Sequence, residues 1–393
     1  MKQLFLFSFF SILFFEAFAQ DTDAEISQKK TVNALIADKG FIIEKNNAAT
    51  GVKNQANTGT CWSFSTTALL ESQLLKSSGI NFDLSEMFTV RNIYIEKAKN
   101  YILRQGHTQF GEGGLGHDLI RAIAKYGAMP ESVYSGLKPG EQYLNHTQLV
   151  NDTKNYLDSI LKAGAKMKAT GAIPANWIDG FMRLLNDNLG VAPETFVFNN
   201  KTYTPLSFAK EVMNFKAEDY VNITSFTHQP FYQPFVLQVP DNFSNGNYYN
   251  LPLDEMIGLV KNGLQNGYTF MWDADVSNAG FMQKNGIAIT VDSVTMVGKE
   301  ITADTKEINW DANLRQRLYE NLTTQDDHLM QITGLEKSKS GKSFFIVKNS
   351  WGKVGPFNGY IQVSETYFAI NTISLVVPKA ALSKALLDKL KLN

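Results

Sequence analysis

A single cysteine, Cys61, constrains this chain more than any other feature, because the sequence contains no second one. Cys61 cannot close an internal disulfide, and one thiolate alone does not make a metal site. Residues 66–75 carry apolar side chains at helical spacing, and Gly79 is a typical helix stop. The pattern predicts Cys61 in the first turn of a helix, where unpaired backbone N–H groups and the helix dipole favour a thiolate and lower the thiol pKa.

A glutamine upstream of the cysteine suggests a second catalytic part. If the intervening turn folds back, the Gln55 side-chain amide and the Cys61 backbone N–H can aim at one point. Two such donors beside a nucleophile form an oxyanion hole. The alternative interpretation is a buried structural cysteine that acts as a small hydrophobe. A partner histidine and an orienting amide later in the chain would favour the catalytic interpretation.

Composition narrows the class of protein. Hydrophobic residues make up 44% of the chain and charged residues 19%, which is typical of a globular protein with a large core. The formal net charge is −1, so the balance gives no reason to expect nucleic acid as a partner.

The first 19 residues are predicted to be a secretory signal. Lys2 supplies a positive start, an apolar run follows at 4–15, and the small-x-small sequence of residues 17–19 is a typical cleavage site. A membrane span needs about 20 apolar residues, so no stable membrane insertion is expected after the signal is removed. A buried N-terminal strand is the alternative. We expect export to the periplasm or the extracellular space.

The middle of the chain predicts helices first and strands later. Helices are expected at 86–105, 116–126 and 253–263, and strands at 235–239, 268–276 and 286–295. Residues 140–235 are predicted to be a mainly helical insertion. Asp273 and Asp275 could suggest a metal or acid–base site, but no histidine or carboxylate cluster supports it, so neither a metal nor another cofactor is expected. His117 is interpreted as a capping or surface residue.

The end of the chain supplies the partners that a catalytic thiol needs. His328 leads an alternating strand, and a second apolar strand delivers Asn349 and Trp351. A thiolate attacks an acyl carbon, an imidazolium protonates the leaving amine, and an amide oxygen holds the imidazole in the right tautomer. Trp351 can shield the Asn349–His328 hydrogen bond from water.

These motifs carry a family resemblance. Gln55 with Cys61–Trp62, Asp327–His328 and the segment 348–352 (Lys-Asn-Ser-Trp-Gly) resemble, in the same order, the three active-site blocks of papain-like cysteine peptidases. Other segments resemble the bleomycin hydrolase and aminopeptidase C branch of that superfamily, and they lie at residues 84–86, 125–130, 204–208, 252–254 and 271–276.

The resemblance implies an α+β, papain-like fold and a set of roles. A helical half would carry the cysteine, and a β-barrel half would carry His328 and Asn349. Cys61 would be the nucleophile, with Gln55 as the oxyanion donor. The substrate-binding residues implied are Gly113, Gly114, Trp62 and Trp351. A homohexamer whose C-terminal tail restricts cleavage to peptide N-termini is also implied, although here the tail after residue 378 is predicted to be a short amphipathic helix.

The predicted organisation has six parts, which are the signal at 1–19, a surface segment at 20–50, the cysteine-bearing half at 51–139, the insertion at 140–235, the β half at 236–378 and the tail at 379–393. The predicted function is that of an exported thiol peptidase acting on peptides, with aminopeptidase activity. An unrestricted endopeptidase, an acyl transferase and an inactive peptide-binding homologue remain as alternatives.

Overall fold

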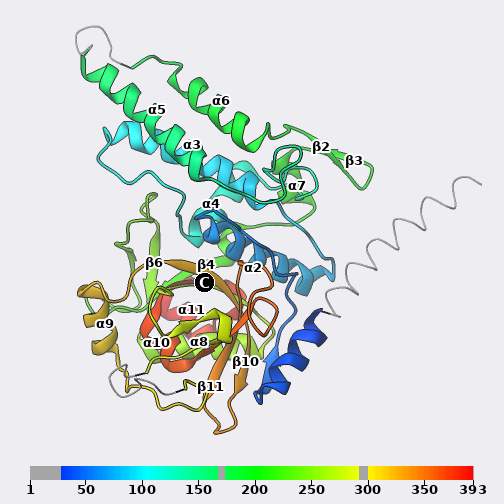
Figure 1. The fold of residues 1–393 in the computed structure, drawn as a ribbon, viewed down its shortest axis with the longest axis vertical. Helices are drawn as coiled ribbons and strands as arrows, with labels where there is room; N and C mark the ends of the chain where they lie inside the picture. The colour runs from blue at the N-terminus through cyan, green and yellow to red at the C-terminus, as the bar shows by residue number, and fades with distance from the viewer. Residues whose placement is uncertain (1–27, 167–172, 292–299, 393) are drawn as a thin grey trace, which may run out of the picture.

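The protein has a helical half and a sheet half, which meet along helix α2 (Cys61–Ser78) (Figure 1). The structure is a computed structural model that describes residues 28–166, 173–291 and 300–392. The predicted signal lies outside the described residues, as does part of the strand predicted at 286–295. The mixed α+β fold predicted from the motifs is confirmed.

Three helices form the base of the helical half, and they are α2 (Cys61–Ser78), α3 (Glu86–Leu103) and α4 (Gly116–Tyr126). Helix α2 begins at Cys61 and ends at Gly79, whose left-handed backbone (φ 70°) suits glycine. Helix α3 begins because the Ser85 hydroxyl accepts a hydrogen bond from the Phe88 amide. All three predicted helices are confirmed, with ends within about two residues of those expected.

The region 140–235 is less helical than the sequence suggested. Helices α5 (Thr147–Lys166), α6 (Trp177–Leu189) and α7 (Pro205–Glu211) are joined by a hairpin of β2 (Phe196–Phe198) and β3 (Lys201–Tyr203). The remainder enters the main sheet as β4 (Tyr220–Thr224) and β5 (Pro234–Val236). Strand β4 alternates buried Val221 and Ile223 with polar residues over only five positions, which is too short a signal to separate from the helical surroundings.

One continuous sheet of eleven strands forms the core of the second half within the described residues. Its order is β5-β6-β4-β13-β7-β10-β11-β12-β9-β8, and β1 pairs with β10. The strands not yet given bounds are β1 (Ile42–Asn46), β6 (Asn247–Asn250), β7 (Phe270–Ala274), β8 (Phe281–Met282), β9 (Ile287–Ala288), β10 (His328–Lys337), β11 (Ser343–Lys348), β12 (Tyr360–Ser364) and β13 (Thr372–Pro378).

Strand β10 connects the two halves. It lies between β7 and β11, and its first residue is His328, as the alternating pattern predicted. One face of these strands packs on helix α2, because Met271 and Leu329 belong to the same apolar core as Cys61. The opposite face holds a second core that includes Trp272 and Met330. The end of β10 is therefore held directly against the beginning of α2.

Helices cover the other side of the sheet and close the chain. Helices α8 (Leu253–Gln265), α9 (Ala312–Glu320) and α10 (Glu365–Asn371) precede a C-terminal helix, α11 (Lys384–Leu390). The tail buries Leu382, Leu386 and Leu390 in the second core, which confirms the short amphipathic helix predicted there. No helix in the described part of the chain is long and apolar enough to cross a membrane.

Candidate active site

The cysteine thiol lies at the beginning of α2, where the helix meets strand β10. Cys61 is 7% exposed, and no other cysteine competes with it. The backbone N–H of Leu329, the residue after His328, donates a hydrogen bond to the thiol. This contact brings the N-terminus of α2 and the start of β10 together across a gap of more than 260 residues in sequence.

The imidazole is fixed by an amide, as the triad hypothesis requires. His328 Nε2 lies 2.7 Å from Asn349 Oδ1. The Asn349 amide is itself held, because its Oδ1 accepts from the Ser350 backbone N–H at 2.7 Å and its Nδ2 donates to Gln283 Oε1 at 3.0 Å. An imidazole nitrogen that faces an amide oxygen carries the proton, so Nδ1 remains available as the proton acceptor.

An indole covers the histidine–asparagine hydrogen bond. The rings of Trp351 and His328 are 4.5 Å apart between centroids, with an interplanar angle of 30°. His328 and Asn349 are 4% and 2% exposed, so water has little access to the hydrogen bond between them. The shielding role predicted for Trp351 agrees with this arrangement.

Gln55, the predicted oxyanion donor, is held by hydrogen bonds to the segment before Cys61 and to the segment after Asn349. Gln55 Oε1 accepts a hydrogen bond from Ser350 Oγ at 2.6 Å, and Gln55 Nε2 donates to the Thr58 carbonyl at 2.7 Å. The backbone N–H of Gln55 also donates to the Ser350 carbonyl. A side-chain amide carries two N–H groups, so the second remains for a ligand oxygen.

The glycine pair and the tryptophan after the cysteine form one wall. Trp62 has no exposed surface, and its indole N–H donates to the Glu112 carbonyl at 3.0 Å. A Cβ at Gly114 would lie 3.1 Å from the Trp62 ring, which is tighter than an ordinary van der Waals contact, so glycine fits best where the loop lies this close. Trp62 therefore packs against the glycine loop. The resemblance implied that Trp62 contacts the substrate directly, but a side chain without exposed surface does not. Gly113 is half-buried, and its carbonyl accepts from Lys97.

Burial favours the neutral forms of both the thiol and the imidazole. Burial raises the pKa of Cys61 to about 12, with the Leu329 amide opposing and the charges of Asp273, Asp326 and Asp241 adding to the rise. Burial also lowers the pKa of His328 to about 4, against the opposing effects of Asn349 and Asp327. The direction for Cys61 is opposite to that predicted from its helix position alone, because burial and the charges of nearby carboxylates raise the pKa.

The model of the Peptidase C1-like family matches residues 12–393. The chain belongs to this family. It is 26% identical over 371 residues to Aminopeptidase C of Streptococcus thermophilus, covering 84% of this chain and 80% of the relative. It is 23% identical over 375 residues to bleomycin hydrolase of Gallus gallus, with the same two coverages. The resemblance stated from the motif blocks is thus confirmed.

A solved structure gives the same fold. PepW from Lactobacillus rhamnosis HN001 superposes with a TM-score of 0.73 at 20% identity, covering 100% of this chain and 96% of that one. Together with the aminopeptidase relatives, the family identifies this chain as a cysteine-type peptidase.

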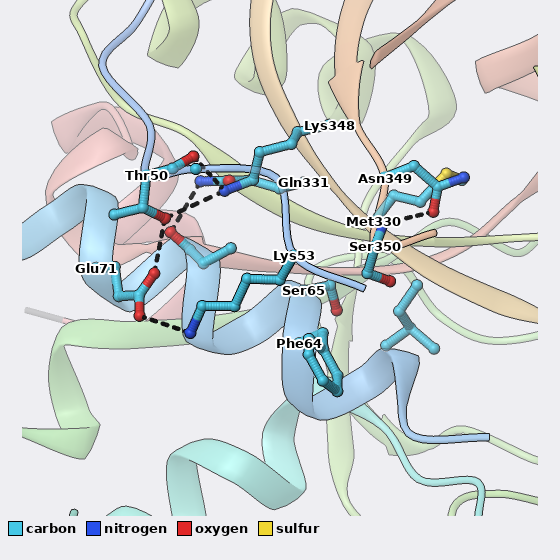
Figure 2. Close-up of a pocket in the computed structure, with 13 residues that line it drawn as sticks. Thr50, Lys53, Phe64, Ser65, Glu71, Met330, Gln331, Lys348, Asn349 and Ser350 are labelled. Carbon is cyan, nitrogen blue, oxygen red and sulfur yellow. Dashed lines mark hydrogen bonds and ion pairs between the residues drawn. The ribbon is translucent and has the colours of Figure 1, made fainter. Parts of the chain in front are cut away.

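Behind the thiol, a buried polar network joins this peptidase's helix α2 to its sheet (Figure 2). Lys348 Nζ donates to the Thr50 carbonyl at 3.0 Å, and Thr50 Oγ1 donates to Glu71 Oε2 at 2.7 Å. Gln331 Nε2 donates to the carbonyl of Ala68 at 3.0 Å. These bonds fix the helix that carries Cys61 against the strands that carry His328.

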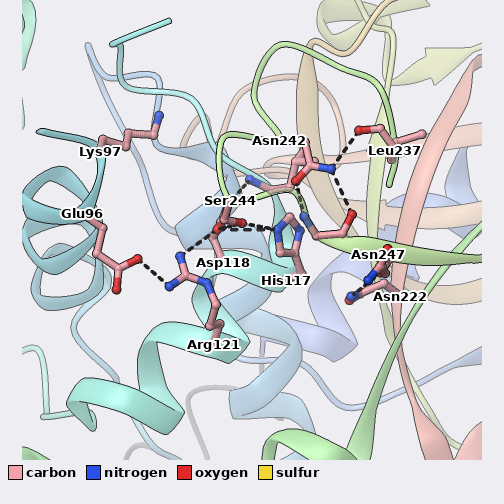
Figure 3. Close-up of polar contacts among 12 residues, drawn as sticks. Glu96, Lys97, His117, Asp118, Arg121, Asn222, Leu237, Asn242, Ser244 and Asn247 are labelled. Atoms are coloured by element: carbon pink, nitrogen blue, oxygen red, sulfur yellow. Dashed lines mark hydrogen bonds and ion pairs between the residues drawn. The ribbon is translucent and has the colours of Figure 1, made fainter. Parts of the chain in front are cut away.

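His117 lies in a structural network rather than on the surface, so the surface part of its interpretation is wrong. It is 7% exposed, and one ring nitrogen lies 2.8 Å from Tyr248 Oη. The other lies 2.8 Å from Ser244 Oγ (Figure 3). Ser244 also donates to Asp118 at 2.8 Å. Helix α4 thereby fixes the loop 237–246. The sequence around His117 contains no motif that would have predicted its contact with this loop.

Two further observations complete the site. Gln283, which holds Asn349, was missed because it lies in a short turn 66 residues away and belongs to no motif. In the described ranges, no group of three or more His, Cys, Asp or Glu residues is placed so that it could hold a metal ion.

Proposed function

We propose that this chain is a thiol aminopeptidase of bleomycin hydrolase type, which cleaves peptides through an acyl-enzyme thioester. The observation that carries the proposal is the 2.7 Å contact between His328 Nε2 and Asn349 Oδ1, next to the thiol at the beginning of α2. The relatives named Aminopeptidase C support the restriction to peptide N-termini.

The mechanism follows from the positions of the thiol, the imidazole and the amide groups around them. As the peptide carbonyl reaches Cys61, His328 Nδ1 takes the thiol proton and Sγ forms a bond to the carbonyl carbon. The Gln55 amide and the Cys61 backbone N–H stabilise the oxyanion. His328 then gives the proton to the leaving amine, and the C–N bond breaks. In the second half, His328 takes a proton from water, whose oxygen attacks the thioester carbon. The C–S bond then breaks, the carboxylic acid leaves, and His328 returns the proton to Sγ.

Hydrolysis of amino-acid coumarylamides with free N-termini tests this function. We expect the purified protein to release the fluorophore, and prior treatment with iodoacetamide to abolish the release because Cys61 is the only thiol. Equal hydrolysis of the acetylated compounds would instead indicate an endopeptidase. No hydrolysis of either kind would contradict the proposal.

We also propose that the protein is exported. The support is the sequence of residues 1–19, with Lys2, an apolar run and the small-x-small site. Expression of the full chain in a bacterial host should give a mature protein that begins at Gln20, recovered from the periplasm or the medium. N-terminal sequencing and cell fractionation check this, and an intact N-terminus in the cytosol would contradict it. Formation of a homo-oligomer stays a prediction from the resemblance.

A further inference from the structure

A buried carboxyl group lies beside the nucleophile and is not used in the mechanism above. Asp273 on β7 is the register partner of Leu329, whose amide contacts the thiol. Because side chains alternate along a strand, Asp273 shares a face with Met271, which packs in the core around Cys61. Asp273 Oδ2 accepts from Ser374 Oγ at 2.9 Å. Its Oδ1 is fully buried and accepts no hydrogen bond from an amide or alcohol group within the described residues.

Two more carboxyl groups approach the same place from different loops. Asp326, two residues before His328, shares a side-chain hydrogen bond with Asp273. The backbone N–H of Asp241 donates to the Asp326 carboxyl group. The Asp241 side chain lies against the glycine pair, since a Cβ at Gly113 would be 1.9 Å from Asp241 Oδ2. Asp241 and Asp326 are half-buried, so part of each residue is exposed to solvent.

The loop that carries Asp241 is held firmly in this position. Asn242 donates to the carbonyls of Leu237 and Gly246, at 2.8 and 3.0 Å, and accepts from the Gly246 amide at 2.7 Å (Figure 3). Ser244 connects the same loop to Asp118 on α4. The Asp241 carboxylate therefore stays beside the glycine pair without support from a ligand.

These carboxyl groups lack a cation of their own. No ion pair in the described ranges includes Asp241, Asp273 or Asp326. Lys97 acts on Asp241 and Asp326 electrostatically, but its ammonium group donates to the carbonyl oxygens of Gly111 and Gly113. Carboxylates gathered in a low-dielectric site repel each other, and a positively charged ligand would relieve this repulsion.

We propose that Asp241 and Asp326 bind the α-ammonium group of the peptide's N-terminal residue, with the buried Asp273 holding Asp326 from the sheet side. The inference rests on the proposed function. In an aminopeptidase substrate the α-nitrogen is two bonds from the carbonyl carbon that Cys61 attacks, so the ammonium group must lie beside the thiol. An acetylated N-terminus would bring a neutral amide and extra atoms against carboxylates, which removes the attraction.

Such a ligand would also act on the nucleophile. The same three carboxyl charges disfavour the Cys61 thiolate. An ammonium group bound among them offsets their charge and so makes removal of the thiol proton easier. Selection of the free N-terminus and activation of the thiol would then come from one contact.

The experiment compares Asp326→Asn and Asp241→Asn with wild type on alanyl, leucyl and arginyl coumarylamides, each free and acetylated. Wild type should prefer the free compounds by at least about tenfold in kcat/KM. Each variant should lose about 10- to 100-fold on the free compounds, the size of a charged hydrogen bond, and little on the acetylated ones. In the absence of substrate, iodoacetamide should alkylate Cys61 faster in the variants, because a negative charge near the thiol has been removed.

A matched control is Asp254→Asn, which makes the same charge change at an exposed position in the first turn of α8. It should change neither measurement. Equal losses on both kinds of substrate together with slower alkylation would reveal a purely structural role and overturn the inference. Equal wild-type rates on free and acetylated compounds would overturn it while leaving a peptidase. If wild type hydrolyses neither, the proposed function fails and the inference fails with it.

Discussion

Replacing Cys61 by alanine should abolish hydrolysis, with kcat lower by roughly 10⁴- to 10⁶-fold, the range seen when a covalent nucleophile is removed. The chain has no other cysteine that could substitute for it. His328→Ala should cost nearly as much, because at neutral pH the thiol keeps its proton unless the imidazole takes it. Steady-state hydrolysis of the free coumarylamides measures both effects.

The double variant separates one catalytic unit from two independent effects. Because the thiol and the imidazole act in the same proton transfer, Cys61→Ala with His328→Ala should be hardly slower than either single variant. Thermal unfolding provides the control, since each single variant should retain a cooperative transition. Activity above about 1% of wild type in Cys61→Ala would contradict the nucleophile assignment.

The parts of the site that could be predicted from sequence are those where local pattern and chemistry coincide. Cys61 lies immediately before a run with helical spacing, and helix α2 begins there. His328 begins an alternating run, and strand β10 begins there. Asn349 directly follows the apolar strand β11, so its position also follows from the strand. In each case one element of secondary structure places the side chain.

The parts that could not be predicted depend on contacts between distant segments. Gln283 holds Asn349, and His117 holds the loop that carries Asp241, yet neither residue belongs to a periodic pattern. The pKa of Cys61 was predicted in the wrong direction for the same reason. The helix terminus is visible in sequence, whereas burial and the approach of Asp241 from a distant loop depend on the tertiary fold.

Lys53 gives the prediction with the largest effect on stability. Its ammonium group lies 2.6 Å from Glu86, 2.7 Å from Asp83 and 3.4 Å from Glu71. Burial alone would lower the pKa of Lys53, but these three carboxylates raise it well above its usual value. Glu71 and Glu86 are 1% and 2% exposed. Lys53→Met should therefore reduce the free energy of unfolding by about 3–5 kcal/mol at about pH 9, where the Glu86 carboxyl group is ionised, as expected when a buried charge loses its partner. Denaturant unfolding measures it.

The pH dependence of the loss follows from Glu86. Burial raises the pKa of Glu86 to about 8, against the opposing effect of Lys53, so the folded state binds this proton more tightly than the unfolded state, in which the pKa is near 4.5. That stability is complete below about pH 4.5 and is lost as pH rises through about 8. Without Lys53 the pKa of Glu86 rises further. The deficit of Lys53→Met should thus be smaller at pH 5.5 than at pH 8.

A second substitution tests whether the unpaired carboxylate is the cause. Adding Glu86→Gln to Lys53→Met removes one buried negative charge, so it should recover part of the lost free energy and flatten its pH dependence. The recovery would identify repulsion and desolvation of Glu86, rather than lost packing of the lysine stem, as the source of the deficit. An unchanged free energy of unfolding in Lys53→Met would show that the ion pairs of Lys53 with Glu71 and Glu86 contribute nothing to holding helix α2 against helix α3.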